Sequence, residues 1–403
     1  MNSLVEEIIE GLYLLRLDDD ETRFFEALWE IPEGITYNSY LLRTGNRTVL
    51  FDTWKKGCGD EFIHRLKEIV DPSKIDFIVV HHTEPDHSGC IGEILEENGY
   101  KAEVIGHPLV KSMLASFYGT SPRFKAVKDG ETLNLDGLKL RFIYTPWLHW
   151  PETIMTYVEN WKLLLSGDAF GSYSIPEGTY DDKIPEDYLW FAKKYFANVI
   201  GHYRPKVKDS IEKITSKLGL KIDIIAPLHG LIWRRNPALI VEKYMSWADA
   251  TPESGKVLVV YSSMYGSVEE AVEKAVEMLE KKGLKPVVFR FTAREQARIA
   301  DIVGEALDMQ GMIVGAATYE NHVFPKMAYV IDLLARKTSA EKPVLIISSY
   351  GWGGIAARKM SEIIGDAGFN ITGVVEFKGG MDEKDKDKLV ASIQKFVESL
   401  QCG

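Results

Sequence analysis

The first half of the chain opens with short apolar runs separated by turn residues. Strands are predicted for residues 12–17, 27–31, 37–42 and 48–52, with turns such as Pro32-Glu33-Gly34 between them. Helical periodicity then alternates with further strands. The predicted helices are 61–70, 91–98, 108–118, 187–200 and 205–218, and the predicted strands are 75–80, 104–105, 138–144, 154–158, 163–165 and 222–226. Two sheets with helices outside, an αββα sandwich, is the expected architecture.

The pattern changes after Thr251-Pro252-Glu253-Ser254-Gly255, a stretch typical of a linker. Five apolar runs follow, and each precedes an amphipathic segment. The runs are 257–261, 286–291, 312–316, 343–348 and 371–377, and the segments are 268–282, 293–307, 325–336, 355–367 and 384–401. Strict βα alternation predicts a flavodoxin-like, doubly wound parallel sheet. We therefore expect an α/β protein with domains at residues 1–250 and 251–403.

Composition narrows the classes of function. The 403 residues are 45% hydrophobic and carry a net charge of −11, which argues against a nucleic-acid partner. No apolar run reaches the roughly 18 residues that a membrane helix needs, and the first ten residues do not resemble a signal peptide, so we expect a cytoplasmic protein. Cys58, Cys90 and Cys402 are too far apart for a disulfide framework, a zinc ribbon or a rubredoxin-type iron centre.

Metal-binding side chains cluster directly after the predicted strand 75–80. The segment His82-Thr83-Glu84-Pro85-Asp86-His87 holds four of them, and three single candidates, His149, Asp168 and His229, lie downstream near the ends of other apolar runs. One such residue alone is more often a solvated loop residue, but seven that follow strands can converge at one sheet edge. Four imidazoles and three carboxylates are more ligands than one tetrahedral zinc ion can bind. They predict two metal ions that share a carboxylate.

The ligand types also bear on which metal binds. Zinc hydrolases of the metallo-β-lactamase fold have H-x-H-x-D-H at this loop, whereas Glu84 stands at the position of their second histidine. An additional anionic oxygen ligand favours ferric iron, which makes a redox-active pair of irons plausible. These residues alone leave a dizinc hydrolase open.

Three βα turns of the second half are candidates for a flavin site. Ser and backbone N–H groups in the first turn suit a monophosphate such as that of FMN, and no Lys follows the glycine as in a Walker loop. Tyr319 or Trp352 could stack on a flat ring. The candidate residues are Ser262, Ser263, Met264, Tyr265, Gly266, Ser267, Ala317, Thr318, Tyr319, Glu320, Asn321, Ser349, Tyr350, Gly351, Trp352, Gly353 and Gly354.

The fourth turn also imitates a dinucleotide fingerprint. Residues 351–356 match G-x-G-x-x-A between a strand and a helix, and Glu376 follows farther on. Such fingerprints occupy the first βα turn, which here is the serine-rich loop. We therefore expect no NAD site.

Taken together, these motifs resemble those of the flavodiiron proteins, or A-type flavoproteins, along essentially the whole chain. The resemblance rests on Thr36-Tyr37-Asn38-Ser39-Tyr40, His82-Thr83-Glu84-Pro85-Asp86-His87-Ser88-Gly89, Leu148-His149-Trp150-Pro151, Gly167-Asp168-Ala169-Phe170-Gly171, Pro227-Leu228-His229-Gly230 and Ser263-Met264-Tyr265-Gly266-Ser267. It implies a metallo-β-lactamase-like domain followed by a flavodoxin-like domain that binds FMN.

The resemblance also implies roles for individual residues. One iron would be held by His82, Glu84 and His149, the other by Asp86, His87 and His229, with Asp168 as the bridge. A head-to-tail homodimer, or a dimer of dimers, would place the FMN of one chain beside the irons of the other. Rubredoxin and its reductase would supply electrons. Two positions depart from the family pattern: Glu26 replaces a histidine near the irons, and Val268 replaces a phosphate-binding threonine.

The leading hypothesis is an oxidoreductase in which FMN passes electrons from an external donor to two irons that reduce O2 to water, NO to N2O, or both. One alternative is a dinuclear metal hydrolase with an accessory flavodoxin module, and another is a plain electron carrier. Beyond the metal ligands, Glu26, His81 and Tyr195 are candidates for supporting the site, for example in proton delivery.

Overall fold

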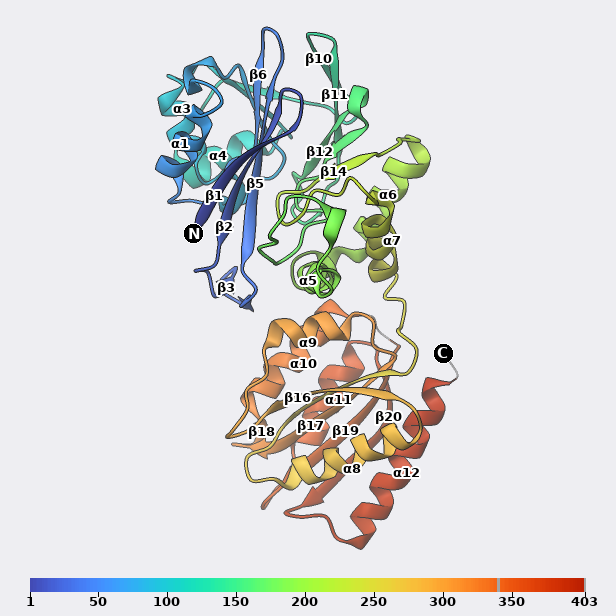
Figure 1. Ribbon diagram of the computed structural model, residues 1–403. Helices are drawn as coiled ribbons and strands as arrows, with labels where there is room; N and C mark the ends of the chain where they lie inside the picture. The colour runs from blue at the N-terminus through green and yellow to red at the C-terminus, as the bar shows by residue number, and fades with distance from the viewer. Residues whose placement is uncertain (339–340, 402–403) are drawn as a thin grey trace. The chain divides into compact units, whose positions relative to one another are not determined.

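The computed structural model describes residues 1–338 and 341–401, and these form two compact units, Met1–Ala248 and Asp249–Gly403. The two units are coloured from blue to yellow-green and from yellow to red in Figure 1. Each unit has its own sheets and its own hydrophobic core.

A seven-stranded sheet begins the first unit, with strand order β1-β2-β5-β6-β7-β8-β9. The strands are antiparallel from β1 to β6 and parallel from β6 to β9. Their bounds are β1 (Asn2–Ile9), β2 (Leu12–Asp19), β5 (Ile35–Arg43), β6 (Thr48–Phe51), β7 (Phe77–Val80), β8 (Glu103–Gly106) and β9 (Phe124–Ala126).

A five-stranded sheet packs against it, in the order β10-β11-β12-β13-β14. Its strands are β10 (Thr132–Leu135), β11 (Leu138–Tyr144), β12 (Ile154–Val158), β13 (Leu163–Leu165) and β14 (Ile224–Ala226). Because side chains alternate along a strand, every second apolar residue points between the sheets. Leu12 and Leu14 of β2 thus share one buried core with Phe142 of β11 and Leu165 of β13.

Helices cover the outer faces of this sandwich (Figure 1). On the side of the seven-stranded sheet lie α1 (Gly59–Lys67), α3 (Ile91–Glu97) and α4 (Val110–Tyr118), and on the other side lie α5 (Tyr188–Tyr195), α6 (Arg204–Glu212) and α7 (Pro237–Ala248). The short α2 (Pro85–Ser88) follows β7, and β3 (Phe24–Phe25) pairs with β4 (Trp29–Glu30). The expected αββα architecture is confirmed.

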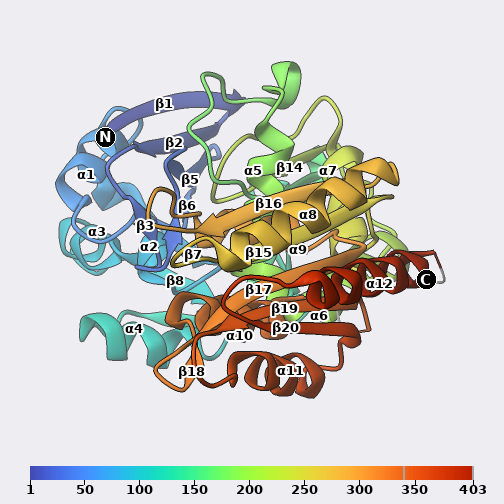
Figure 2. The ribbon, with the colours of Figure 1, turned by 90° about the horizontal axis from the view of Figure 1, so that it is seen from below.

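The second unit is a parallel sheet with strand order β16-β15-β17-β19-β20. This is the 2-1-3-4-5 order of flavodoxin-like folds, with the short β18 (His322–Val323) antiparallel to β17. The strands are β15 (Lys256–Ser262), β16 (Lys285–Phe291), β17 (Gly311–Tyr319), β19 (Pro343–Tyr350) and β20 (Asn370–Lys378). The helices are α8 (Ser267–Lys281), α9 (Ile299–Ala306), α10 (Pro325–Lys337), α11 (Ala356–Asp366) and α12 (Glu383–Leu400). In Figure 2, α8 and α12 cover one face of this sheet and α10 and α11 the other.

Two local expectations were wrong. Within residues 27–31 only Trp29–Glu30 is a strand, because Glu26 and Ala27 have φ of 50° and 57° and turn the chain into a small hairpin. Residues 293–298 are not helical: the Thr292 hydroxyl accepts hydrogen bonds from the Arg294 and Glu295 N–H groups, a local turn that competes with a helix. In addition, the strands β1, β3, β9 and β10 of the first unit were not predicted.

Among the residues that the structure describes, no helix has both the length and the apolar character needed to cross a membrane.

Asn38 of β5 ties the two sheets together and supports the loop after β14. Its Nδ2 donates to the carbonyls of Pro227 at 3.0 Å and Gly230 at 3.1 Å, and its N–H donates to the Leu228 carbonyl at 2.7 Å. The side chain is fully buried.

We expect Asn38→Ala to lower the free energy of unfolding of the first unit by about 2 kcal/mol, because the buried Gly230 carbonyl loses its side-chain donor and the Pro227 carbonyl keeps only the Tyr40 hydroxyl. Urea titration followed by tryptophan fluorescence measures this. An equal loss in the exposed control Asn2→Ala would contradict the assignment.

Candidate metal centre and cofactor pocket

The loop after β7 carries four of the seven predicted metal ligands. Pro85 occupies the first turn of α2, where its missing N–H costs nothing. Gly89 ends the segment in contact with residues 55–56, where a Cβ would lie 2.0 Å from the Lys56 nitrogen and 2.3 Å from the Pro85 carbonyl oxygen. Only glycine fits that contact. The loop is therefore held against the seven-stranded sheet with His82, Glu84, Asp86 and His87 on one side.

The other three candidates come from the five-stranded sheet and its loops. His149 precedes β12, Asp168 follows β13, and His229 follows β14. Gly230, next to His229, has a φ of 78°, and a Cβ there would lie 2.3 Å from the Tyr188 hydroxyl. The loop after β14 can therefore turn back only with glycine at this position.

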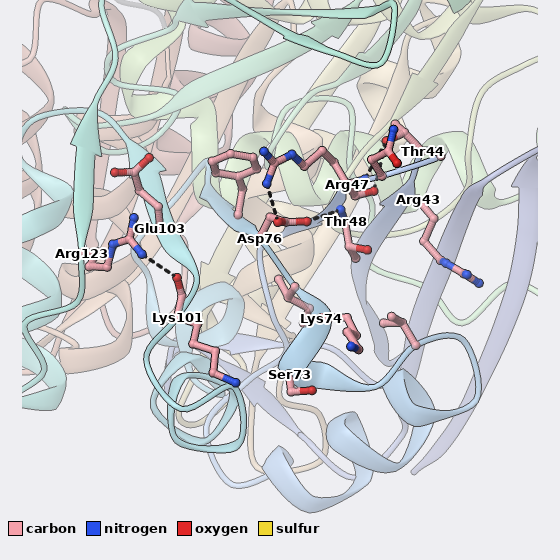
Figure 3. Close-up of a pocket in the computed structure, with 15 residues that line it drawn as sticks. Arg43, Thr44, Arg47, Thr48, Ser73, Lys74, Asp76, Lys101, Glu103 and Arg123 are labelled. Carbon is pink, nitrogen blue, oxygen red and sulfur yellow. Dashed lines mark hydrogen bonds and ion pairs between the residues drawn. The ribbon is translucent and has the colours of Figure 1, made fainter.

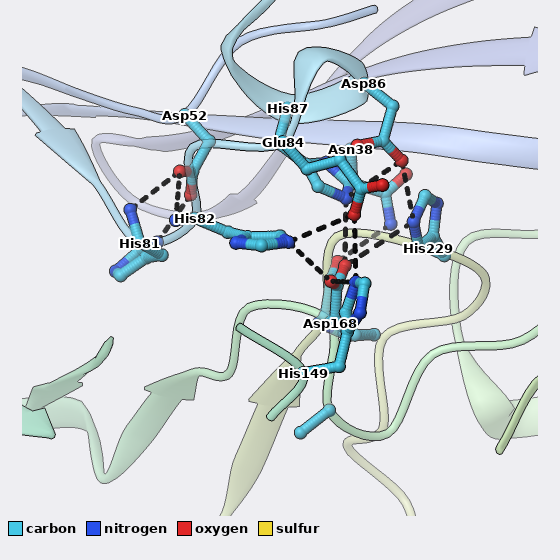
Figure 4. A network of polar contacts seen from close by, with 12 residues as sticks. Asn38, Asp52, His81, His82, Glu84, Asp86, His87, His149, Asp168 and His229 are labelled. Atoms are coloured by element: carbon cyan, nitrogen blue, oxygen red, sulfur yellow. Dashed lines mark hydrogen bonds and ion pairs between the residues drawn. The ribbon is translucent and has the colours of Figure 1, made fainter. Parts of the chain in front are cut away.

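The structure brings all seven side chains together, in two adjoining groups (Figure 4). One group contains His82, Glu84, His149 and Asp168, and the other contains Asp86, His87 and His229. His82, His87 and His229 are almost completely buried, and His149 is 6% exposed.

The Asp168 carboxylate lies between the two groups. Its Oδ2 is 3.4 Å from His82 Nε2 and 3.3 Å from His149 Nε2. Its Oδ1 is 2.8 Å from His87 Nε2 and 3.5 Å from His229 Nε2. One oxygen therefore faces each group, which is the arrangement that a carboxylate bridging two metal ions requires.

The remaining carboxylates each belong to one group. Glu84 Oε2 is 3.1 Å from His82 Nε2 and 2.9 Å from His149 Nε2. Asp86 Oδ2 is 3.3 Å from His87 Nε2 and 3.5 Å from His229 Nε2. Each group thus pairs two imidazoles with one carboxylate of its own.

Partners outside the cluster fix the orientation of two imidazoles. His82 Nδ1 donates to Glu152 Oε1 at 2.9 Å, and His229 Nδ1 donates to the Thr36 carbonyl at 2.6 Å. A neutral imidazole that donates from Nδ1 has its lone pair on Nε2, so each ring is oriented to offer Nε2 to a metal ion. Glu152 Oε1 also accepts from the Thr83 N–H and hydroxyl, each at 3.0 Å. Glu152 is fully buried.

Sequence reasoning missed Glu152 as a supporting residue. Its signal was its position three residues after His149, in Leu148-His149-Trp150-Pro151-Glu152. A carboxylate close to a candidate ligand histidine can orient an imidazole, but only the structure reveals that the imidazole is that of His82.

The cluster is strongly coupled electrostatically. Burial alone would lower the pKa of His149, but hydrogen bonds with Asp168 and Glu84 outweigh burial and raise it to about 9. Burial also opposes ionisation of Asp168, yet His87, His149 and His82 hold its pKa well below the usual range. Asp168 therefore stays ionised, and its negative charge helps His149 to hold a proton when no metal is bound.

Several buried polar atoms of the cluster have no hydrogen bond of good geometry among the described residues, although other atoms of the cluster lie close to them. They are both carboxylate oxygens of Asp86, Oδ1 of Asp168 and Nε2 of His87 and His229. Leaving such atoms buried without partners is unfavourable, whereas metal ions would satisfy them. The mixture of imidazole and carboxylate donors fits iron as well as zinc.

The three other candidate residues occupy different environments. His81 points away from the cluster, with Nδ1 2.5 Å from Asp52 Oδ2 and Nε2 2.8 Å from the Thr156 hydroxyl, as Figure 4 shows for Asp52. The Tyr195 ring packs edge-on against His229 at 5.4 Å, and its buried hydroxyl has no hydrogen-bond partner in the part of the chain that the structure describes. Glu26 accepts a hydrogen bond from Trp29 Nε1 at 2.9 Å.

The second unit has a cavity of about 540 Å³ at the carboxyl end of its sheet. It is lined by Met264, Tyr265, Ser267, Ala317, Thr318, Tyr319, Glu320, Asn321, Ser349, Tyr350, Gly351, Trp352, Gly353 and Gly379. Apart from Gly379, these were all candidates from sequence. Tyr265 and Trp352 are 95% and 94% exposed. Aromatic rings so exposed beside a cavity provide surfaces that a flat ring system can cover.

Four of the predicted cofactor residues do not line the cavity. The Ser263 hydroxyl accepts hydrogen bonds from the Gly266 N–H at 3.1 Å and the Glu269 N–H at 3.4 Å, so it shapes the turn. Ser262 has a buried hydroxyl without a hydrogen-bond partner among the described residues, and Gly354 abuts the Glu376 carboxylate. Gly266 adopts a φ of 95° and forms the N-cap of α8. Val268 is buried in the core.

Two family models match this chain. Residues 35–230 match the ODP family beta lactamase model, and residues 259–395 match the flavodoxin model. The first range includes all seven metal candidates, and the second includes every predicted cofactor residue.

Individual relatives match over most of the chain. A nitric oxide reductase from Moorella thermoacetica is 31% identical over 357 residues, covering 88% of both chains. A mutant of the flavo di-iron protein from Thermotoga maritima is 40% identical with a TM-score of 0.92, covering 99% of each chain. The rubredoxin oxygen:oxidoreductase from Desulfovibrio gigas is 27% identical, also with a TM-score of 0.92 and 99% of each chain covered.

Replacing Glu152 tests its role in orienting His82. We expect Glu152→Gln to weaken metal binding by about 10- to 100-fold, because the neutral amide supports the imidazole less well than a carboxylate. Metal retained against a chelator, quantified per chain, measures the effect, and circular dichroism checks the fold. Metal retention equal to that of the exposed control Glu96→Gln would count against the role.

The stability of the metal-free protein should depend on pH through His149. Its folded pKa of about 9 lies above the ordinary 6.5, so its stabilising contribution is complete below about pH 6.5 and is lost as the pH rises through 9. Urea unfolding of metal-free protein between pH 6 and 9.5 should therefore show stability falling with pH. His149→Gln should flatten part of that profile. Stability that rises over this range would overturn the expectation.

Proposed function

This chain belongs to the flavodiiron protein family, and on that premise we propose that it reduces O2 to water, NO to N2O, or both, with electrons from a separate donor protein. The position of Asp168, with one oxygen toward each half of a buried cluster of imidazoles and carboxylates, supports this most directly. The relatives whose names state an activity are oxidoreductases, so the hydrolase hypothesis is not retained.

We assign the two iron sites from the two groups. His82, Glu84 and His149 would hold one iron, Asp86, His87 and His229 would hold the other, and Asp168 would be shared by both. The cavity of the second unit would hold FMN, with Tyr265 and Trp352 available to cover the ring and the N–H groups at the start of α8 available to the phosphate. When bound, reduced FMN and two ferrous ions together supply the four electrons that convert O2 to water.

Residues around the cluster keep water away from it and provide a hydroxyl group that can donate a hydrogen bond. Phe25, Tyr37 and Tyr195 pack edge-on around His229, and Trp150 packs edge-on against His82, so aromatic rings rather than water surround these ligands. Burial raises the pKa of Tyr195 well above 10, so its hydroxyl remains protonated. With no hydrogen-bond partner among the described residues, that hydroxyl is able to donate to a bound diatomic molecule or its reduction product.

Glu26 distinguishes this chain from relatives with a histidine at the corresponding position. Its Oε2 is occupied by the Trp29 indole N–H, and its φ of 50° belongs to the turn between β3 and β4. We propose that Glu26 supports this turn, and with it Phe25 beside His229, instead of acting on the gas.

A first test measures the reaction itself. Protein with iron and FMN quantified per chain is photoreduced without air and mixed in a stopped-flow instrument with O2 or NO separately. We expect about two irons and one FMN per chain and rapid flavin reoxidation by at least one gas, without peroxide release. Asp168→Asn should lower this rate by about 100-fold or more, unlike the exposed control Asp387→Asn. A fully loaded protein inert to both gases would refute the proposal.

A second test concerns the proposed head-to-tail homodimer, in which electrons pass from the FMN of one chain to the irons of the other. Asp168→Ala removes the metal bridge, and Ser267→Asp places a negative charge against the FMN phosphate. Reassociated mixtures of the two inactive variants should recover roughly a quarter of wild-type activity, because half of the dimers then hold one complete pair of sites. No recovery, although mixed dimers form, would indicate transfer within one chain.

A further inference from the structure

A second pocket of about 540 Å³ lies at the edge of the seven-stranded sheet opposite to the metal loop. Figure 3 shows the side chains that line this pocket. It is formed where β6, β7 and β8 begin and just before β9, whereas the metal loop follows the end of β7. The pocket is therefore separate from the site of gas reduction and from the flavin cavity.

The charge of this pocket is opposite to that of the whole chain. Five cationic side chains and two carboxylates line it, although the protein carries a net charge of −11. The cations are Arg43, Arg47, Lys74, Lys101 and Arg123, and the carboxylates are Asp76 and Glu103. The positive charge is thus concentrated in one concave site, where it attracts anions.

Most of these cations form no ion pair with the described residues. Arg47 pairs with Asp76 at 2.8 Å, and Asp76 also accepts from the Thr48 N–H at 2.8 Å. Arg43, Lys74, Lys101 and Arg123 have no carboxylate within ion-pair distance in residues 1–338 and 341–401. Asp136, behind the turn at residues 44–47, is engaged by Thr44 and Asn46.

Two guanidinium groups of the pocket are oriented by hydrogen bonds to neutral carbonyl groups instead of by carboxylates. Arg43 donates to the Ile69 carbonyl at 3.1 Å, and Arg123 donates to the Lys101 carbonyl at 3.2 Å. A neutral carbonyl fixes the orientation of a guanidinium but leaves its remaining N–H groups and its charge for another partner. Planar guanidinium groups in fixed positions suit bidentate contacts with phosphate.

Apolar side chains also line the pocket. Val70 and Phe77 are half-buried there, beside the Ser73 and Thr44 side chains. The volume lies in the range of small-molecule sites and exceeds the needs of a single inorganic phosphate. Cations that belong to four different segments can contact several phosphate groups, while Val70 and Phe77 offer apolar surface to a flat base.

From this combination we propose that the pocket binds a nucleoside polyphosphate, with the phosphates against Lys74, Lys101 and Arg123 and the base against the half-buried Val70 and Phe77. This inference does not depend on the gas-reductase function. Binding should weaken as the salt concentration rises, because the contacts are largely electrostatic and partly exposed.

The test is isothermal titration calorimetry of the iron- and FMN-loaded protein with ADP at low ionic strength. Loading with FMN keeps the flavin cavity filled, so that ADP cannot bind there. Pyrophosphate and adenosine are titrated separately. We expect one saturable ADP site per chain, with ADP at least about tenfold tighter than either fragment, because both the phosphates and the base contribute.

Variants of pocket residues test whether ADP binds in this pocket. Lys74→Ala/Lys101→Ala should weaken ADP binding by about tenfold or more. The control Lys111→Ala/Lys217→Ala removes the same charge from exposed positions outside the pocket and should leave it unchanged. Arg123→Lys keeps the charge but loses the bidentate fork, and should also weaken binding. Absence of saturable ADP binding, an equal loss in the control, or pyrophosphate binding as tight as ADP would overturn the proposal.

Discussion

The first unit is organised around one electrostatic constraint, the buried Asp168 carboxylate between four imidazoles. A carboxylate in this setting is unfavourable unless positive charge or hydrogen-bond donors surround it. His82 and His149 face one of its oxygens, and His87 and His229 face the other. The strand ends, the glycines at positions 89 and 230 and the buried Glu152 and Asn38 all serve to hold this arrangement, so the surrounding fold is best understood as its support.

The positions of the seven clustered side chains could be predicted because each lies near a strand end, and strand ends of a sandwich meet at one edge. The two-group arrangement could not be predicted in the same way, since it depends on which oxygen of Asp168 faces which ring. Glu152 escaped prediction because its partner, His82, is 70 residues away in the sequence. The segment 293–298 was mistaken for helix because a periodic apolar pattern outweighed the turn made by the Thr292 hydroxyl.

The fold of the second unit could be predicted more completely from the sequence. Its three central strands, β15, β17 and β19, are almost entirely buried, as expected for parallel strands covered on both faces. The strand order brings the first, third and fourth βα turns to one cavity. Residue-level detail was less predictable. Ser263 appeared suited to phosphate, yet its hydroxyl stabilises the turn itself. Gly379, at the end of β20, lines the cavity although no motif pointed to it.

The metal candidates are divided between the two sheets of the sandwich. Four follow β7 of one sheet, and three lie in loops of the other. An ion bound by ligands from both sets links the two sheets across the hydrophobic core. Its binding free energy stabilises the folded unit, because the ligands are close enough to bind it only when the sheets are packed together. Iron supply during biosynthesis would then govern how long each newly made molecule survives proteolysis, as well as whether it is active.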